Sequence, residues 1–403
     1  MRLLIPVFSP QTGTWGGLTR SLGVAEAAIA RGDKVAFCGS GYVEESLRGL
    51  GHRVYPMPAA TMLGLPRPLS RRIKDRAQQH ALPIGPGRSV GSIWTVLAAT
   101  GMARARYLRR LVDAQLHAAA DFRAEALFAD LDPGAYVTAA IARIPIASAY
   151  SQVMTGGTGG LPWALMRRAM AAVLEDHGLP PRRPEELFFG PHVLKIVPSV
   201  PELDDADPAR PDVLYAGSLL GRLCPQSLAG SGFDPVGRHV FVYVGTGSVR
   251  LETLRRVLPA LFPAGGEVTC VVAAQSVTTP FRLAGVRFSP YVDAEALLPR
   301  CDWMICHAGQ NSIVRSLRHG VPLIMFPGAV FERRYNAQHV AAAGAGVMGE
   351  SDQFTPAWLS GVLRRREDYR ERAEELGERM NACGGAPAAV EAIAAHALVP
   401  GRT

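Results

Sequence analysis

The chain has 403 residues, of which 48% are apolar and 19% are charged, so it is long enough for two or three domains with cores of their own. Its net charge of +8 is carried almost wholly by arginine, and no nucleic-acid-binding motif accompanies that excess. We therefore expect a globular protein without a nucleic-acid partner, whose arginines lie mostly on a solvated surface.

The cysteines and the first residues indicate the compartment. None of the six cysteines belongs to a CxxC pair, and four lie inside apolar runs, namely Cys38, Cys270, Cys301 and Cys306. This pattern predicts buried free thiols in a reducing compartment. The opening "MRLLIPVFSP" has no long apolar core or cleavage site, and no uncharged apolar run reaches about 18 residues. We expect a cytoplasmic protein that does not associate with membranes.

The first half alternates between strand and helix patterns. "RLLIPVF" (2–8) predicts a buried strand, "LTRSLGVAEAAIARG" (18–32) a helix, and "KVAFCG" (34–39) the next strand. These three elements form a βαβ unit with a right-handed crossover. The alternation resumes at "ALFADL" (126–131) and continues through a helix and a strand to residue 150. Between them, residues 62–120 are helical and rich in arginine, and we predict that they form an insertion.

A second α/β unit starts at "HVFVYVGTGS" (239–248), where a strand again leads into a glycine loop and a helix. The segment before it is rich in proline and aspartate, which is typical of a linker. The helix pattern "APAAVEAIAAHAL" near the end is apolar over much of its surface and must pack on something. The predicted division is a first domain at 1–212 with the insertion at 62–120, a linker at 213–235, a second domain at 236–382, and a C-terminal helix at 383–403 packed on the first domain.

The stretch "CDWMICHAGQNS" (301–312) carries a candidate phosphate site. A strand ends near Cys306, His307 follows it, and Asn311 and Ser312 open the next helix. The N-terminus of a helix has unpaired N–H groups and a positive dipole end, so it binds phosphate. Gly309 lets the backbone approach closely, and His307 can add a hydrogen-bond donor. The alternative is a helix cap beside a histidine that is already satisfied.

"HAGQNS" resembles the donor-binding signature of the UDP-glycosyltransferases, whose plant members have His-Cys-Gly-Trp-Asn-Ser there. The likeness extends over 239–346, including "VYVGTGS", "YVDAEALLPRCD", "GVPLIMFP" and "ERRYNAQHVAAAGAG", and the first domain begins as the acceptor domain of this family does. The resemblance, closest to bacterial natural-product members, implies the α/β GT-B fold of two facing Rossmann-like domains. It implies an inverting, metal-independent glycosyltransferase with a nucleotide sugar as co-substrate and no cofactor.

The resemblance implies a donor site in the second domain, made of Thr246, Ser248, Val292, His307, Gly309, Asn311, Ser312, Glu332 and Arg333. His307, Asn311 and Ser312 would hold the diphosphate, with the hydroxyls of residues 246 and 248 near the phosphates and the sugar. Val292 would meet the base through its backbone. Glu332 and Arg333 occupy the positions that contact sugar hydroxyls in the family.

On the acceptor side, Thr14, Gly16 and Gly17 belong to the loop that carries the catalytic histidine of the family, and Gly17 stands at the histidine position. Glycine cannot accept the acceptor proton. Asp130 matches the usual partner aspartate, Asp132 being second choice, and is our candidate base. Either aspartate could instead only cap the following helix. A third alternative is an acceptor acidic or nucleophilic enough to need little help.

Two arginines also depart from the family. Arg315 replaces a glutamate that binds the ribose hydroxyls, which favours dTDP over UDP unless Arg315 is only a solvated helix residue. Arg333 replaces a glutamine, and it either pairs with Glu332 or selects a sugar with a carboxylate. The apolar helix predicted at 161–178 forms core or acceptor pocket, the alternative being a membrane face for a lipid acceptor.

We therefore predict transfer of a sugar from a UDP or dTDP donor to a small, apolar natural-product acceptor. Two alternatives stay open besides a lipid-directed transferase. One is a catalytically silent nucleotide-sugar-binding partner of another transferase, which Gly17 favours. The other is a nucleotide-sugar 2-epimerase. A homodimer or a partner protein is not excluded.

Overall fold

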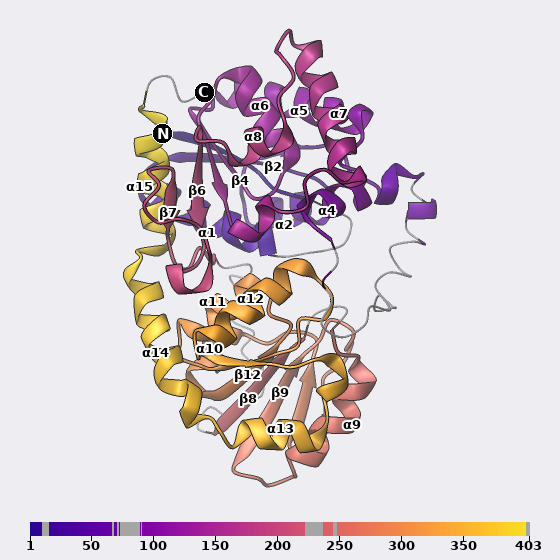
Figure 1. The fold of residues 1–403 in the computed structure, drawn as a ribbon, viewed down its shortest axis with the longest axis vertical. Helices are drawn as coiled ribbons and strands as arrows, with labels where there is room; N and C mark the ends of the chain where they lie inside the picture. Colours follow the sequence, from indigo (N-terminus) through magenta and orange to yellow (C-terminus); the bar gives the residue numbers. More distant parts are fainter. Residues whose placement is uncertain are drawn as a thin grey trace.

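Two α/β domains, each built on a mainly parallel sheet, stack along the long axis of the molecule (Figure 1). The computed structural model describes residues 1–9, 16–66, 68–70, 72, 89, 91–221, 237–244 and 248–399. Each domain has a seven-stranded sheet with helices on both faces, and the second domain follows the first in the chain. This is the GT-B architecture that the resemblance implied.

The sheet of the first domain is wholly parallel and has the strand order β3-β2-β1-β4-β5-β6-β7. Its strands are β1 (Arg2–Pro6), β2 (Lys34–Gly39), β3 (Val54–Pro56), β4 (Ala126–Ala129), β5 (Ile146–Ala149), β6 (Val193–Val197) and β7 (Val213–Tyr215). Its helices are α1 (Gly16–Ala30), α2 (Tyr42–Gly49), α4 (Ile93–Ala99), α5 (Ala105–Phe122), α6 (Pro133–Ala142), α7 (Leu161–Asp176) and α8 (Pro184–Phe189).

The second sheet has the order β10-β11-β9-β8-β12-β13-β14, and only the β10–β11 pair is antiparallel. Its strands are β8 (Arg238–Tyr243), β9 (Val268–Ala273), β10 (Phe281–Leu283), β11 (Val286–Ser289), β12 (Cys301–Cys306), β13 (Leu323–Met325) and β14 (Gly346–Met348). The helices that follow along the chain are α9 (Leu251–Leu261), α10 (Ala294–Leu297), α11 (Gln310–Leu317), α12 (Phe331–Ala342), α13 (Pro356–Leu363), α14 (Glu367–Ala382) and α15 (Gly385–Ala397).

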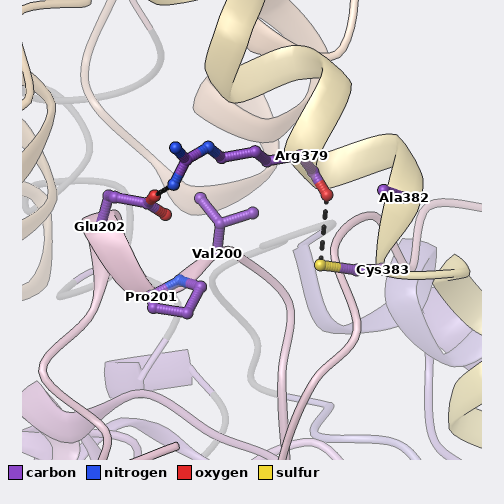
Figure 2. A pocket seen from close by; sticks show the side chains of 6 residues that line it. All are labelled: Val200, Pro201, Glu202, Arg379, Ala382 and Cys383. Atoms are coloured by element: carbon purple, nitrogen blue, oxygen red, sulfur yellow. Dashed lines mark hydrogen bonds and ion pairs between the residues drawn. The ribbon is translucent and has the colours of Figure 1, made fainter.

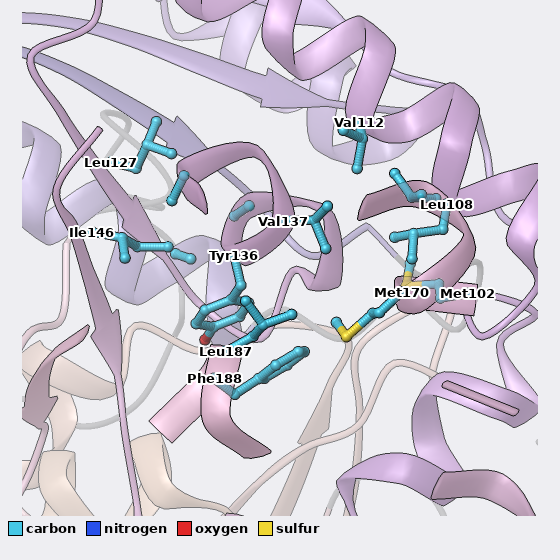
Figure 3. Close-up of a cluster of buried hydrophobic side chains, with 14 of the residues drawn as sticks. Met102, Leu108, Val112, Leu127, Tyr136, Val137, Ile146, Met170, Leu187 and Phe188 are labelled. Atoms are coloured by element: carbon cyan, nitrogen blue, oxygen red, sulfur yellow. The ribbon is translucent and has the colours of Figure 1, made fainter. Parts of the chain in front are cut away.

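Each sheet divides the core of its domain into two layers, because successive side chains of a buried strand point to opposite faces. In β1, Leu4 faces the layer of α4 to α8, whereas Leu3 and Ile5 face the layer of α1, α2 and α15. Figure 3 shows the first layer, where the rings of Tyr136 and Phe188 stack with centroids 4.0 Å apart. These packed layers hold the strand ends, and so the site, in fixed positions.

The predicted helix at 161–178 is part of this core. Met166 and Met170 of α7 are fully buried, and Met170 points toward Leu108 and Met102 of the neighbouring elements in Figure 3. The prediction that this helix belongs to the core is therefore confirmed.

Two predicted boundaries are wrong. Residues 213–215, assigned to the linker, form the edge strand β7, paired with Lys195–Val197 of β6. The insertion predicted at 62–120 includes most of α5, which belongs to the α/β fold itself. This helix leads into β4 and buries Leu108 and Val112 in the core. Its arginines lie on the outer face, which gave the stretch its polar composition.

The chain returns to the first domain at its end. Helix α14 packs on α11 of the second domain, and α15 then packs on α1 and on strands β4, β5 and β6 (Figure 1). Ala389, Val390 and Ile393 are buried in the core layer that α1 shares. Helix α15, at Gly385–Ala397, thus packs on the first domain.

The described cysteines form no disulfide, and the four predicted to be buried, Cys38, Cys270, Cys301 and Cys306, are buried. Within the described residues, none of the helices is long and apolar enough to cross a membrane.

Candidate functional site

The N-terminus of α11 lies against the first domain. Strand β12 ends at Cys306, the chain turns through Ala308 in a left-handed conformation (φ 58°), and Gly309 caps the helix. The side chain of Gln310, the first helical residue, donates to the carbonyl of Pro198 in the first domain at 2.9 Å. The N–H groups and positive dipole end of α11 therefore point toward the space between the domains.

His307 lies beside this helix end as a neutral ring. Burial, reinforced by the charge of Arg333, lowers the pKa of His307 to about 3. Its Nδ1 is 3.3 Å from the carbonyl oxygen of Tyr243, and because a carbonyl only accepts, Nδ1 carries the proton. The Nε2 atom is then left with a lone pair.

Gly309 is needed because of this imidazole. A Cβ atom at position 309 would lie 2.6 Å from Nε2 of His307, closer than such contacts are found. The small residue therefore makes room for the ring. The two residues act as one unit at the end of β12.

Asn311 connects the two domains. Its amide nitrogen donates to the carbonyl of Gly16 at 3.1 Å, and its side-chain oxygen accepts from Nη1 of Arg20 at 2.8 Å. Both partners belong to α1 of the first domain. The resemblance assigned the side chain of Asn311 to the diphosphate, but here it bridges α11 of the second domain and α1 of the first domain.

Asp130, the candidate base, is held by Arg20. The guanidinium donates from Nε to one carboxylate oxygen at 2.7 Å and from Nη2 to the other at 3.0 Å. Asp130 is 1% exposed and the side chain of Arg20 is 14% exposed, so this is a buried, two-point ion pair. Burial lowers the pKa of Arg20, but the charges of Asp130 and Glu332 outweigh it and raise the pKa above its usual value.

Asp132, the second candidate, is a helix cap. Its carboxylate accepts from the backbone N–H of Ala135 at 3.0 Å and from the amide of Gln115 at 2.9 Å. Burial raises its pKa, although both hydrogen bonds act against the shift. The capping alternative is thus the correct one for Asp132, and it is not correct for Asp130.

Gly17 lies directly over Asp130. A Cβ atom built at position 17 would be 3.5 Å from the carboxylate carbon of Asp130, which is ordinary contact. The histidine position of the family and its aspartate partner are therefore adjacent in this chain. Arg20, three residues after Gly17 on the same helix face, takes the aspartate that a histidine at 17 would use.

Arg20 was missed by the sequence analysis. The signal that could have found it is its spacing of three residues from Gly17 within a predicted helix, which puts both on one face. The resemblance did not indicate Arg20, because it matches no residue of the family motif and the histidine position is a glycine.

A pocket between the domains, called the cleft pocket below, is lined by two of the predicted site residues, Asp130 and Glu332. The first domain lines it with Arg20, Asp130 and Tyr150 among others, and the second with Gln310 and Glu332. Burial raises the pKa of Tyr150 to about 12, and its hydroxyl donates to Gln152 at 2.6 Å. Its walls thus come from both domains, as a two-substrate site requires.

Asp204 fixes one wall of the cleft pocket. Its carboxylate accepts from the hydroxyl of Ser151 at 2.5 Å and from the backbone N–H groups of Gln152 and Ala206. Burial raises its pKa against the effect of these bonds. Residues 151–152, which follow β5, are thereby held to the chain segment that leads toward the second domain.

Glu332 and Arg333 open helix α12. Glu332 lines the cleft pocket, and one of its oxygens accepts from Asn336 at 3.1 Å. Burial lowers the pKa of Arg333, which the charge of Glu332 opposes, and the arginine acts in turn on His307 and Tyr243. The structure thus brings Arg333 close to the histidine at the end of β12.

Arg334 anchors this helix start. It donates to both oxygens of Glu350 at 3.1 and 2.6 Å, and to the carbonyl of Gly328 at 3.1 Å. Because Arg334 is 6% exposed, the pair is shielded from water. It fixes the loop that precedes α12, and with it Glu332.

The remaining predicted donor residues lie near the ends of their strands. Ser248 is buried and donates to the carbonyl of Val244 at 2.7 Å, and Val292 is buried 14 residues before the end of β12. Ser312, also buried, lies in the first turn of α11. Thr14 and Thr246 lie outside the described residues, so the structure does not place their side chains.

Arg315 forms an ion pair with Glu295 and is not simply a solvated residue of the helix. Its Nε is 3.0 Å from Glu295 of α10, which also accepts from His319 at 2.9 Å. Burial raises the pKa of Glu295, but His319, Arg315 and Arg318 lower it overall. A carboxylate therefore lies next to position 315, although the sequence has no glutamate at 315 itself.

A second pocket lies between the segment that follows β6 and the end of α14 (Figure 2). It is lined by Val200, Pro201, Glu202, Arg379, Ala382 and Cys383, and Glu202 pairs with Arg379 across it. None of the predicted site residues lines this pocket. We therefore place the candidate site in the cleft pocket.

In the part of the chain that the structure describes, no three His, Cys, Asp or Glu side chains are grouped to hold a metal ion. The positive groups near the predicted diphosphate position include the N-terminus of α11, Arg333 and Arg20.

Parts of the sequence match known proteins. Residues 255–395 match the family model of the erythromycin biosynthesis protein CIII-like C-terminal domain. A 4'-demethylrebeccamycin synthase of Lentzea aerocolonigenes is 32% identical over 143 residues, 34% of this chain and 33% of the relative. A UDP-N-acetylglucosamine–N-acetylmuramyl-(pentapeptide) pyrophosphoryl-undecaprenol N-acetylglucosamine transferase of Bifidobacterium longum is 28% identical over 196 residues, 48% of each chain. The chain thus spans about half the length of this relative and a third of the synthase.

The fold matches over the whole chain. The glycosyltransferase VinC, whose crystal structure is a complex with dTDP, superposes with a TM-score of 0.69 and 18% identity, covering 98% of this chain and 99% of VinC. At this identity the likeness concerns the fold. Residues 255–395 therefore resemble the erythromycin biosynthesis protein CIII-like C-terminal domain, in a chain whose two domains together have the fold of the GT-B glycosyltransferases.

Proposed function

We propose that this protein transfers a sugar from a nucleoside diphosphate sugar to a small, apolar natural-product acceptor. One observation carries the proposal: the N-terminus of α11, with His307 beside it, is tied across the cleft by Asn311 to Gly16 and Arg20. The first turn of α11 and the start of α1 therefore lie in contact across the cleft, which supports a donor site and an acceptor site that face each other. The match to an antibiotic-biosynthesis family supports the class of acceptor.

The diphosphate would bind at the N-terminus of α11. The helix end offers N–H groups, and Arg333 adds a positive charge near His307. His307 has a pKa of about 3 because it is buried next to that arginine. A diphosphate beside Nε2 would raise this pKa, so that the ring takes up a proton and donates to a phosphate oxygen.

The sugar would lie between the diphosphate and Asp130. Glu332 lines the cleft pocket there, and its carboxylate can accept hydrogen bonds from sugar hydroxyls. The acceptor would enter along the wall made by Tyr150 and Ser151 on the first domain. In this arrangement the acceptor oxygen and the diphosphate lie on opposite sides of the anomeric carbon, which supports a single displacement with inversion.

The proposal needs no metal ion. Charge that develops on the leaving diphosphate is met by the fixed dipole of α11 and by the guanidinium of Arg333. Groups that are already oriented stabilise such charge without reorganising at the moment of reaction.

The nucleotide would be dTDP or UDP, and the surroundings of Glu295 favour dTDP. This carboxylate is engaged by Arg315 and His319, so it offers less to the two hydroxyls of a uridine ribose. A thymidine nucleotide has only one of these hydroxyls. That VinC was crystallised with dTDP agrees with this choice.

The proposal is tested by incubating the full chain with dTDP-glucose or UDP-glucose and a set of natural-product aglycones. Mass spectrometry detects the glycoside and the released nucleotide, and NMR of the product gives the anomeric configuration. We expect a β-glycoside from the α-linked donor. An α-glycoside would contradict inversion, and a donor that is turned over without any acceptor product would contradict the transferase assignment.

A further inference from the structure

The charged groups that line the cleft pocket are unusual for a site that must deprotonate a hydroxyl. Among the described residues that line it, the titratable groups are Arg20, Asp130, Tyr150 and Glu332. Deprotonating a neutral alcohol requires a group that accepts its proton, and these four are the candidates among the described residues of the pocket.

Asp130 is not available as a base. Both of its oxygens accept from Arg20, at 2.7 and 3.0 Å, in a pair that is shielded from water. Protonating the carboxylate would leave the guanidinium buried without a counter-charge on that side, which is costly. Asp130 therefore keeps Arg20 in place and does not take a proton from the acceptor.

Tyr150 and Glu332 do not serve as the base either. Burial raises the pKa of Tyr150 to about 12, so its hydroxyl keeps its own proton at neutral pH. Glu332 stands on the donor-domain helix α12, with one oxygen bonded to Asn336. The proposed function assigns its carboxylate to the hydroxyls of the donor sugar, which would then occupy it during transfer.

Arg20 offers what an anionic acceptor needs. A guanidinium has five N–H groups and no acceptor, and three of the five donate to Asp130 and Asn311. Among the contacts of the described residues, one N–H on each Nη nitrogen is left for a ligand. The raised pKa of Arg20 keeps it cationic at every physiological pH. A fork of two N–H groups matches the geometry of a carboxylate.

We propose that the acceptor reacts through an oxygen that is already ionised at neutral pH, a carboxylate or an acidic phenolate, held by Arg20. This inference rests on the proposed function and names the chemical class of its acceptor. The anionic oxygen attacks the anomeric carbon as the bond from that carbon to the diphosphate oxygen breaks. The electron pair of the broken bond leaves with the nucleoside diphosphate, and no proton is transferred. The product is a glycosyl ester or an aryl glycoside with inverted configuration.

The inference is tested with acceptors matched in shape but not in charge. The full chain is incubated with dTDP-glucose or UDP-glucose and with pairs of aromatic probes, benzoate against benzyl alcohol and 4-nitrophenol against 4-nitrobenzyl alcohol. The set is then extended to polycyclic aglycones sorted in the same way. We expect transfer to the acids and acidic phenols and none to the alcohols, measured as kcat/KM from product mass spectrometry.

Variants of Arg20 test the recognition step. Arg20→Gln should lower kcat/KM for the anionic acceptors by about ten- to a hundredfold, the size of one charge-assisted hydrogen bond. Arg20→Lys keeps the charge without the fork and should lie between. Because Arg20→Gln alone leaves Asp130 buried and unpaired, the double variant Arg20→Gln/Asp130→Asn removes both charges and should show the same loss. Arg48→Gln removes an exposed guanidinium on α2 and is the control.

The outcomes separate the two proposals, with dTDP and UDP binding to each variant measured by calorimetry. Transfer to neutral alcohols that matches transfer to the acids would overturn the anionic-acceptor inference. So would acid transfer that is undiminished in Arg20→Gln, or no transfer to any acid by a chain that binds the nucleotide. Failure to bind either nucleotide would instead overturn the proposed function itself.

Discussion

At the residue scale, the main feature of the candidate site is the partner of Asp130. This partner is Arg20, whereas the resemblance implied a histidine at the position that Gly17 occupies. The resemblance assigns Gly17 and Asp130 to the histidine and aspartate positions of the UDP-glycosyltransferases, and the structure brings these two residues together. Arg20, which takes the aspartate, could not be found in that way because it matches no family motif. Its role depends on its place on one face of α1 and on a salt bridge with Asp130. These two residues are 110 positions apart in the sequence, so only the fold brings them together.

Gly17→His is expected to widen the acceptor range. The new Cβ fits 3.5 Å from the carboxylate carbon of Asp130, and an imidazole there can accept the proton of a neutral alcohol. Since Arg20 competes for the same oxygens, the gain should be larger in Gly17→His/Arg20→Gln. The measurement is kcat/KM for benzyl alcohol against pH, where activity should rise as the new histidine loses its proton.

The control for this change is Gly17→Ala, which adds the Cβ without the imidazole. A gain in alcohol transfer by the alanine variant would show that the base is not the cause. Alcohol transfer that is absent from both histidine variants would mean that the position does not face the acceptor oxygen.

Gly309→Ala is expected to disturb the donor site. Its Cβ would lie 2.6 Å from Nε2 of His307, so the ring must move, and overpacking of this kind costs about 1–3 kcal/mol. Calorimetry should show weaker binding of dTDP, and thermal unfolding a lower Tm. Gly361→Ala is the matched control, because its Cβ meets nothing within 4 Å in a helix of the same domain. Unchanged nucleotide affinity in Gly309→Ala would count against this placement of the diphosphate.

At the scale of elements, the strongly periodic segments were predicted well. The strand at 34–39 and the turn from β12 into α11 lie where their patterns indicated, because buried parallel strands are continuous apolar runs. The pattern was misleading for α5, where an arginine-rich outer face hid an apolar inner face that packs on the sheet. The short edge strands β7 and β10 were missed because three residues carry too little periodicity.

The end of β12 predicts a dependence of stability on pH. His307 has a pKa of about 3 in the folded state against 6.5 ordinarily, so the unfolded state binds the proton more readily. The stabilising effect of a neutral His307 is complete above about pH 7 and is lost as pH falls toward 3. At pH 5 the loss of stability is about 2 kcal/mol, because pH 5 lies about 1.5 units below the ordinary histidine pKa and each unit is worth about 1.36 kcal/mol.

Urea unfolding of the wild type and of His307→Gln at pH 7 and pH 5 measures this effect. His52 and His192, whose pKa values are also lowered by burial, titrate equally in both proteins and cancel. We expect the wild type to lose about 2 kcal/mol more than the variant between the two pH values. Equal losses would show that His307 is not buried as a neutral ring.

At the scale of the whole molecule, contacts far apart in the sequence join the two domains. Among the described residues, Asn311 crosses the cleft, and Tyr335 and His339 of α12 contact Asp205 of the first domain at 2.8 to 3.1 Å. Helix α15 also returns the chain to the first domain. The two-domain architecture followed from the repeated strand–helix pattern, but these contacts join residues more than 100 apart and have no local signal.

The packing of α15 predicts a large effect of one core truncation. Ile393 is 1% exposed in the core layer that it shares with α1, so Ile393→Ala should lower the free energy of unfolding by about 2–5 kcal/mol. Leu398, one residue beyond α15, is 82% exposed, and Leu398→Ala should change it by less than about 0.5 kcal/mol. Denaturant unfolding measures both. Equal, small effects would mean that α15 does not belong to the core of the first domain.

The central claim is that a nucleoside diphosphate binds at the N-terminus of α11 beside His307. Isothermal calorimetry of dTDP and UDP with the wild type, with His307→Ala and with His117→Ala tests it most directly. His117 is an exposed histidine on α5 of the other domain and serves as the control. We predict binding by the wild type and by His117→Ala, and a loss of about tenfold or more in His307→Ala, where a charge-assisted hydrogen bond is removed. Absence of binding by the wild type, or equal affinity in all three proteins, would contradict the account.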